Sequence, residues 1–242
     1  MNTFSDSVNT AIGLVLAGDA GLWAIVLRSL AVSVTATVIA YALGLWLGAW
    51  LASARFAGRG VALTLLNTAL AVPAVVVGLV VYLLLSRSGP LGFLGWLFNF
   101  EAMVVAQAVL VLPLVTALVR QTVEDAERSH GEQLRSMGAG TLMRSLLLAW
   151  DERYALLTVF ITAFGRAIAE VGTVMIVGGN IDGFTRVMTT AIALETSKGD
   201  LPLALGLGVV LLAVVLVLNA LVSLVRRWRE RADGLVPLGV GI

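Results

Sequence analysis

Long apolar stretches, separated by shorter polar segments, dominate the sequence. A helix needs about 20 mostly apolar residues to cross the roughly 30 Å hydrocarbon core of a bilayer. Five stretches are about this long, and we predict a membrane-spanning helix in each of them: 23–51, 61–85, 102–119, 155–177 and 201–225. The pattern therefore predicts an all-α integral membrane protein, in which residues 1–242 form a single transmembrane domain.

The first two stretches contain residues that bear on how the helices sit and pack. Arg28 lies near the end of the first stretch, where a long side chain can extend to the lipid headgroups. Pro73 lies inside the second stretch, where neighbouring helices can satisfy the carbonyl group that it leaves free. Gly44 and Gly48 are four residues apart, a spacing typical of closely packed membrane helices. We therefore expect a bundle of closely packed helices.

The composition supports a lipid environment. Hydrophobic residues make up 59% of the 242 residues and charged residues 13%, whereas soluble domains contain roughly 45–50% apolar and about 25% charged residues. The mean hydropathy is +0.98. The net charge of +1 and the lack of cysteine argue against a nucleic-acid partner, a disulfide framework and a thiolate metal site. The lipid bilayer is the first expected partner, and no cofactor is indicated.

Basic residues are distributed unevenly between the segments that connect the stretches. Arginines concentrate after the first, third and fifth stretches, at positions Arg55, Arg59, Arg120, Arg128, Arg135, Arg144, Arg153, Arg226, Arg227, Arg229 and Arg231. The opposite side has only Arg87, Arg186 and Lys198. Because cytoplasmic segments of membrane proteins are enriched in Lys and Arg, we expect the N-terminus outside and the C-terminus in the cytoplasm.

Two connecting segments have a helical character of their own. Residues 181–195 are moderately apolar but too short to cross a bilayer, which leaves a re-entrant segment and a surface helix as alternatives. Residues 120–153 read as short amphipathic helices broken at Gly138 and Gly140. Such helices suit either docking into a groove of another protein or lying on the membrane surface, and periodicity does not choose between the two.

One part of this polar segment resembles a known motif. Residues 132–139, EQLRSMGA, are similar to the EAA motif of permeases in ATP-binding-cassette (ABC) importers. Glu132 and Gly138 match the spacing of the motif, whereas two alanines are replaced and Trp150-Asp151 stands where the family has Leu-Pro. The resemblance implies contact with an ATPase subunit through Glu132, Gln133, Leu134, Gly138 and Ala139.

A second resemblance is more specific. Residues 164–172, FGRAIAEVG, resemble the Arg-Ala-x-x-Glu-x-Gly pattern of molybdate and tungstate permeases. The likeness continues through VGGNI at 177–181 and TRVMTTAIALET at 185–196, a string similar to the tungstate type in particular. Tungstate-type members also resemble this chain in lacking the Leu-Pro. The resemblance covers roughly residues 22–225, which is most of the chain.

Membership in this family would imply a fold, a location and a set of partners. The fold would be that of a type I ABC importer permease, the MetI-like fold, in the inner (cytoplasmic) membrane. Two permease copies would form a homodimeric pore, two ATPase subunits would dock on the cytoplasmic segment 120–153, and an external binding protein would deliver the oxyanion. Lys198, the only lysine, is followed by Gly199-Asp200 and cannot belong to a phosphate-binding loop of the ATPase type. We therefore expect a transport subunit rather than an enzyme.

An oxyanion path needs polar side chains inside the membrane. Arg166 and Glu170 are four residues apart in the fourth stretch and share one helix face. They either line or gate the path, or form an ion pair that only fixes helix packing. Neutral donors further out are expected from Thr173 and Asn180. An outer mouth or re-entrant segment would contain Thr185, Arg186, Thr189 and Thr190, for which docking of the binding protein or helix capping is the alternative.

The substrate and the transporter class leave further alternatives. Molybdate or sulfate would suit a permease of the same type, because selectivity would reside mainly in the external binding protein. An independent secondary transporter commonly shows internal repeats, and we find no convincing repeat between the halves of the chain. A membrane enzyme would need a nucleophile–base pair or a metal set, and the sequence does not assemble one. Tungstate import by an ABC permease is the function that we expect.

Overall fold

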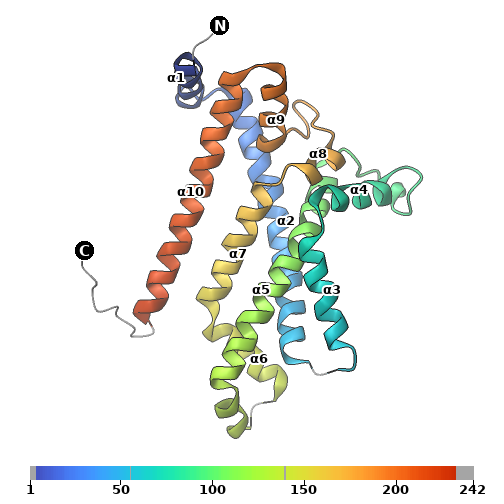
Figure 1. Ribbon diagram of the computed structural model, residues 1–242, viewed down its shortest axis with the longest axis vertical. Helices are drawn as coiled ribbons and strands as arrows, with labels where there is room; N and C mark the ends of the chain where they lie inside the picture. The colour runs from blue at the N-terminus through green and yellow to red at the C-terminus, as the bar shows by residue number, and fades with distance from the viewer. Residues whose placement is uncertain (1–3, 55, 139, 233–242) are drawn as a thin grey trace.

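The computed structural model describes residues 4–54, 56–138 and 140–232, which form helices and connecting segments without a β-strand. The helices are α1 (Phe4–Leu16), α2 (Ala20–Ser53), α3 (Arg59–Ala71), α4 (Ala74–Leu85), the 3-10 helix η1 (Gly92–Leu94), α5 (Phe100–Ser136), α6 (Thr141–Asp151), α7 (Arg153–Ile168), α8 (Gly172–Gly178), α9 (Met188–Lys198) and α10 (Leu201–Ala232). Figure 1 shows an elongated bundle with the long helices roughly along one axis. The expected all-α fold is confirmed.

The apolar helices account for the expected spans in two different ways. α2, α5 and α10 are each long and apolar enough to cross a membrane. Two further units are pairs of shorter helices, α3 with α4 and α7 with α8, which meet at angles of 101° and 59°. The described residues therefore provide three straight spans, and five if each bent pair counts as one. The expected number of about five holds on that count.

The first bend follows from Pro73. Proline lacks a backbone N–H and disfavours helical conformation in the residue before it. Val72 is accordingly extended, with ψ 127°, and Pro73 has ψ 134° before α4 starts at Ala74. α4 therefore runs across the direction of α3 (Figure 1). The stretch 61–85 is thus two helices of 13 and 12 residues, each shorter than the roughly 20 residues of a straight span.

The second bend separates α7 from α8 at residues 169–171. Gly172 begins α8, and a Cβ at this glycine would lie 2.9 Å from Cγ2 of Val75 in α4. Gly78 is equally close to α8, because its Cβ would lie 3.0 Å from Cα of Thr173. The second halves of the two bent units, α4 and α8, therefore pack closely against each other at these glycines.

The core forms where α2 and α5 pack side by side. A Cβ at Gly44 would lie 2.7 Å from Cγ1 of Val115, and one at Gly48 would lie 2.7 Å from the carbonyl oxygen of Thr116. These contacts agree with the packing expected from the glycine spacing, since small residues let membrane helices approach closely. Buried valines and alanines from both helices continue the contact, among them Val32, Ala36, Ala40, Val111, Val119 and Val123.

α10 lies at the edge of the bundle and carries the most exposed apolar side chains of the spans. Leu212 and Leu216 are each 70% exposed. Exposed apolar side chains on a long helix are suited to contact with lipid tails. α9 precedes α10 and packs against it, with Met188, Thr190 and Ala191 buried. The segment 181–195 is thus a loop followed by a short, half-buried helix.

Candidate translocation path and coupling segment

The predicted coupling segment lies at the end of the molecule opposite the N-terminus (Figure 1). α5 extends well beyond the expected span and ends at Ser136, and α6 starts at Thr141. Gly138 has φ +79°, a left-handed conformation that favours glycine, and Gly140 is the residue before α6. The predicted interruption at these two glycines therefore matches the turn between the helices.

The side chains expected to contact an ATPase lie on the surface of this segment. Glu132 and Gln133 are exposed and Leu134 is half-buried, whereas Ala139 lies outside the described residues. Large apolar side chains are exposed around the same turn: Met137, Met143, Leu147 and Trp150. An ion pair between Arg144 Nε and Glu127 Oε1, 3.4 Å apart, ties α6 back to α5. The segment thus presents an apolar surface on a braced helical hairpin.

Glu170 is the centre of the polar contacts within the membrane-spanning part. Its side chain is 5% exposed, and it lies in the break between α7 and α8. Arg166 Nη1 donates to Glu170 Oε2 at 2.7 Å, while the Thr173 backbone N–H donates to Oε1 at 3.2 Å. The Thr189 hydroxyl donates to the Glu170 carbonyl at 2.7 Å. The buried carboxylate is therefore paired and hydrogen-bonded, as a charge in a low-dielectric interior requires.

Arg166 differs from its partner in exposure. The Arg166 side chain is 46% exposed, and it donates to Glu170 through Nη1. A guanidinium has five N–H donors, so most of them remain available on the exposed side. The pair thus combines a buried anion with a cation that reaches the surface of the single chain.

Thr173 connects the two bends. Its hydroxyl donates to the carbonyl of Ala74 at 2.8 Å, a group in the first turn of α4. The same residue contacts Glu170 through its backbone N–H. One threonine therefore joins the break of the α7–α8 unit to the break of the α3–α4 unit.

Sequence reasoning missed a buried amide beside this centre. Gln107 of α5 is 3% exposed, and its Nε2 donates to the carbonyl of Ala167 at 3.0 Å. Gln107 lies close to Ser29, Ser33, Glu170 and Thr189. A glutamine within an apolar stretch was the available signal, but only the fold shows that it faces the α7–α8 break.

The remaining predicted residues lie in a second network, between α8 and α9. The Thr185 hydroxyl donates to the Gly178 carbonyl at 2.5 Å, and Asn180 Nδ2 donates to the Thr190 carbonyl at 3.3 Å. Thr190 Oγ accepts from the Val187 N–H at 3.2 Å at the start of α9. These donors bind acceptors between α8 and the first turn of α9, so the structure groups them apart from Arg166 and Glu170.

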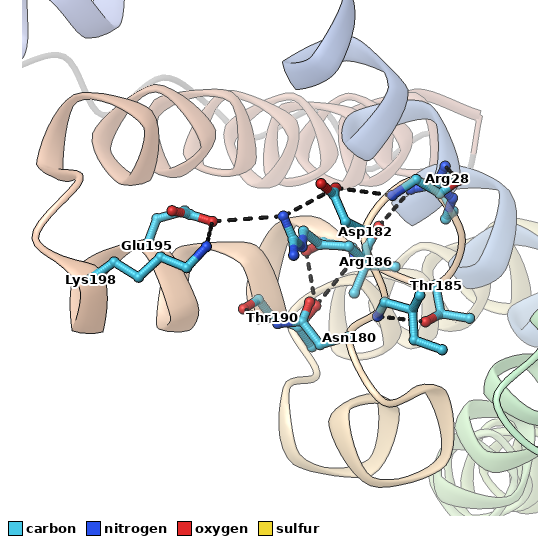
Figure 2. A network of polar contacts seen from close by, with 11 residues as sticks. Arg28, Asn180, Asp182, Thr185, Arg186, Thr190, Glu195 and Lys198 are labelled. Atoms are coloured by element: carbon cyan, nitrogen blue, oxygen red, sulfur yellow. Dashed lines mark hydrogen bonds and ion pairs between the residues drawn. The ribbon is translucent and has the colours of Figure 1, made fainter.

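Arg186 is the charged centre of this second network (Figure 2). Its Nη1 lies 3.1 Å from Asp182 Oδ1 and 3.7 Å from Glu195 Oε1. Lys198 Nζ also contacts Glu195 Oε1, at 3.1 Å. The arginine side chain is only 14% exposed. Its acidic partners could not be assigned from sequence, because Glu195 lies on the following helix.

Arg28 also belongs to this network, through contacts that the sequence did not predict. Its Nη1 donates to the Arg186 carbonyl at 3.0 Å and its Nη2 to the Gly183 carbonyl at 2.7 Å. Backbone carbonyls of the loop thus accept hydrogen bonds from both terminal nitrogens of this guanidinium. Arg28 thereby fixes the loop between α8 and α9 to α2.

Taken together, these features define a class: a polytopic helical membrane protein with charged groups at the break of one span and an exposed helical hairpin at one end. The comparison with known families gives a particular assignment. Residues 40–232 match the family described as "Binding-protein-dependent transport system inner membrane component". The chain belongs to this family, and the resemblance to importer permeases is confirmed.

Individual relatives carry more specific names. The chain is 40% identical over 211 residues to a probable anion ABC transporter permease protein of Haloferax volcanii, covering 85% of this chain and 90% of the relative. It is 39% identical over 226 residues to the tungstate uptake system permease protein TupB of Peptoclostridium acidaminophilum, covering 92% and 97%. The molybdenum transport system permease protein ModB of Escherichia coli K12 is 29% identical over 234 residues, covering 87% and 96%.

Proposed function

We propose that this chain is the permease subunit of an ABC importer that carries tungstate across the inner (cytoplasmic) membrane. The names and coverage of the relatives support an anion and favour tungstate. The observation in the structure that carries the proposal is the pair at the α7–α8 break, in which a half-exposed Arg166 is held by a buried Glu170. A charged side chain within an apolar bundle is costly, and such residues typically line the path of a substrate or an ion.

The pair suits transient contact with an oxyanion. Glu170 neutralises much of the charge of Arg166, so an anion meets donors without a full unpaired cation. Tight binding inside a path would slow release, and partial neutralisation avoids it. Thr173 and Thr189 hold the carboxylate and its backbone in place. In this proposal Arg166 lines or gates the path, and Glu170, Thr173 and Thr189 position it.

The exposed face of Arg166 also supports a second copy of the chain. A half-exposed guanidinium cannot face lipid tails without a large desolvation cost. A homodimer with Arg166 near the shared face would enclose the path in protein and water. The partner copy would then contribute a second Arg166 to the same path.

The two ends of the molecule suit two different partners. The arginine-rich end with the α5–α6 turn would face the cytoplasm, and its apolar surface at Met137 and Met143 would enter a groove of the ATPase subunit. Glu132, Gln133, Leu134, Gly138 and Ala139 would form or support that contact. The opposite end, with the loop around Asn180, Thr185, Arg186 and Thr190, would face the external binding protein.

Uptake into proteoliposomes tests the substrate. The complete transporter is loaded in turn with tungstate, molybdate and sulfate through its binding protein, and ATP-dependent uptake is measured. We expect tungstate to be taken up from the lowest concentration. Preferred uptake of molybdate or sulfate would replace tungstate within the same class, and no uptake of any oxyanion would overturn the proposal.

A further inference from the structure

A cavity of about 430 Å³, open to the surface of the single chain, lies between α5, α7 and α10 on the arginine-rich side of Arg166. Its polar lining consists of hydroxyl groups from two helices, Thr122 on α5 and Tyr154, Thr158 and Thr162 on α7. The apolar remainder is formed by Leu118, Ala155, Val159 and Val225. None of these hydroxyl residues belongs to the sites described above.

Polar residues on α7 form a stripe that ends at Arg166. Tyr154, Thr158, Thr162 and Arg166 follow each other at intervals of four residues, a spacing that brings each side chain next to the one on the following turn. Because a turn has 3.6 residues, the stripe winds around the helix as it approaches Arg166. The polar stripe therefore leads from the first turn of α7, which begins at Arg153, to the guanidinium at the other end of the helix.

The threonines are satisfied without a ligand but keep the capacity to bind one. Thr158 donates to the Tyr154 carbonyl at 3.1 Å, Thr162 to the Thr158 carbonyl at 2.8 Å, and Thr122 to the Leu118 carbonyl at 3.0 Å. A hydroxyl proton rotates to suit its surroundings. Each O–H can therefore turn from its own helix to an anion in the cavity and return when the anion leaves.

We propose that this hydroxyl-lined cavity is the cytoplasmic part of the translocation path, where an oxyanion that leaves Arg166 is held weakly before release. The inference rests on the proposed function and on the orientation given there. Neutral hydroxyl donors suit this step, because they contact the oxygen atoms of a tetrahedral dianion without the strong attraction of a cation. The convergence of three threonines from two helices distinguishes the cavity from single threonines that face lipid.

A neighbouring cavity limits where the anion is held. It shares Thr122 and Ala155 with the first and is lined further by Asp125, Ser129 and Glu152. Carboxylates repel an oxyanion, so the proposed binding part ends at the threonines.

Accessibility of Thr162 tests whether the cavity holds water or lipid. The natural chain has no cysteine, so Thr162→Cys introduces a single thiol into each permease chain. In inside-out vesicles we expect a membrane-impermeant, anionic methanethiosulfonate reagent to label this thiol. The matched control is Leu216→Cys on the exposed face of α10, where the side chain is 70% exposed but apolar in its surroundings. A Thr162→Cys thiol as inert as the control would overturn the proposal.

Removal of the hydroxyls tests whether they act on the substrate. The double variant Thr158→Val and Thr162→Val should lower ATP-dependent uptake about tenfold or more, because hydrogen bonds to a charged ligand are among the stronger ones. The control variant Thr64→Val and Thr68→Val removes threonines on α3 that make the same bonds to their own helix, at 3.0 and 2.8 Å, but lie outside the cavity.

The outcomes separate this inference from the proposed function. Normal uptake by the Thr158→Val and Thr162→Val variant, or an equal loss in the α3 control, would overturn the role of the cavity while the permease assignment stands. Thr158→Ser with Thr162→Ser, which keeps both hydroxyls, should retain uptake; a loss equal to that of the valine variant would also overturn it. Failure of the wild-type transporter to take up any oxyanion would overturn the proposed function itself.

Discussion

A carboxylate inside a membrane protein is costly unless it is paired, and Glu170 meets this requirement with Arg166 and the backbone N–H of Thr173. The arrangement is asymmetric, since the carboxylate is 5% exposed and the guanidinium 46%. A pair that served only packing would bury both partners. The exposed half of Arg166 therefore supports a role towards a ligand in addition to its role towards Glu170.

Removing both charges together separates the two roles of this pair. Replacement of a complete buried ion pair by neutral groups is often nearly neutral for stability, whereas removal of one partner costs about 3–5 kcal/mol. We expect the double variant Arg166→Gln and Glu170→Gln to assemble with a thermal stability close to that of the wild type but to lose at least about tenfold in uptake, the loss of a strong charge-assisted hydrogen bond. Uptake at the wild-type rate would show that the pair serves packing alone.

At the scale of the residue, the sequence indicated which side chains carry polar chemistry better than it indicated their hydrogen-bond partners. Arg166 and Glu170 could be paired from their spacing, because an interval of four residues places two side chains on one helix face. The partners of Arg28 and Gln107 could not be found, because both donate to backbone carbonyls far along the chain. Backbone carbonyls carry no sequence signal of their own, so only the fold identifies these contacts.

At the scale of the helix, the turn between α5 and α6 depends on the left-handed conformation of Gly138. Gly138→Ser introduces a Cβ into that conformation at a cost of about 1–2 kcal/mol, which would distort the proposed ATPase contact. We expect uncoupling, with ATP hydrolysis retained and uptake reduced severalfold. Gly140→Ser is the matched control, because Gly140 has φ −66° at the position before α6, where serine is favourable. Coupled uptake in both variants would contradict the role of Gly138.

The contact between α2 and α5 gives a second prediction at this scale. An added Cβ at Gly48 would lie 2.7 Å from the Thr116 carbonyl oxygen and 2.8 Å from Cβ of Val119. Gly48→Ala should therefore push the helices apart and lower the free energy of unfolding by about 1–3 kcal/mol, seen as a lower thermal transition in detergent. Gly208→Ala on α10, with no atom within 4 Å of its Cβ, should leave the transition unchanged. Equal effects of the two variants would contradict the packing described here.

Hydropathy predicted the helical units but not their shape. Pro73 signalled an interruption in the second unit, yet the angle of 101° depends on tertiary contacts such as that between the Thr173 hydroxyl and the Ala74 carbonyl. The break at Glu170 had a weaker signal, because neither alanine nor glutamate interrupts a helix by itself. Helices were expected in residues 120–153, but the continuity of α5 from the span to Ser136 was not, because hydropathy detects only the part of a helix inside the membrane.

At the scale of the whole molecule, the polar features follow the long axis of the bundle. The loop held by Arg28 and Arg186 lies towards one end of the bundle, and the α5–α6 turn lies at the other end (Figure 1). The Arg166–Glu170 pair lies between them, at the bend between α7 and α8. This order suits a path that receives the oxyanion from a binding protein at the first end and contacts the ATPase subunit at the second, the driven end. The family supplies the transport role, and the proposed direction follows from the arginines around the driven end.

Omission of single components from a reconstituted transporter tests this account most directly. Proteoliposomes contain the chain with its ATPase subunit and binding protein, or lack one of the two partners, and tungstate uptake is followed with ATP on the cytoplasmic side. The account predicts uptake by the complete assembly and only background uptake when either partner is omitted. Uptake at the full rate by the chain alone would contradict the account, because the driving force would then not come from a partner that hydrolyses ATP.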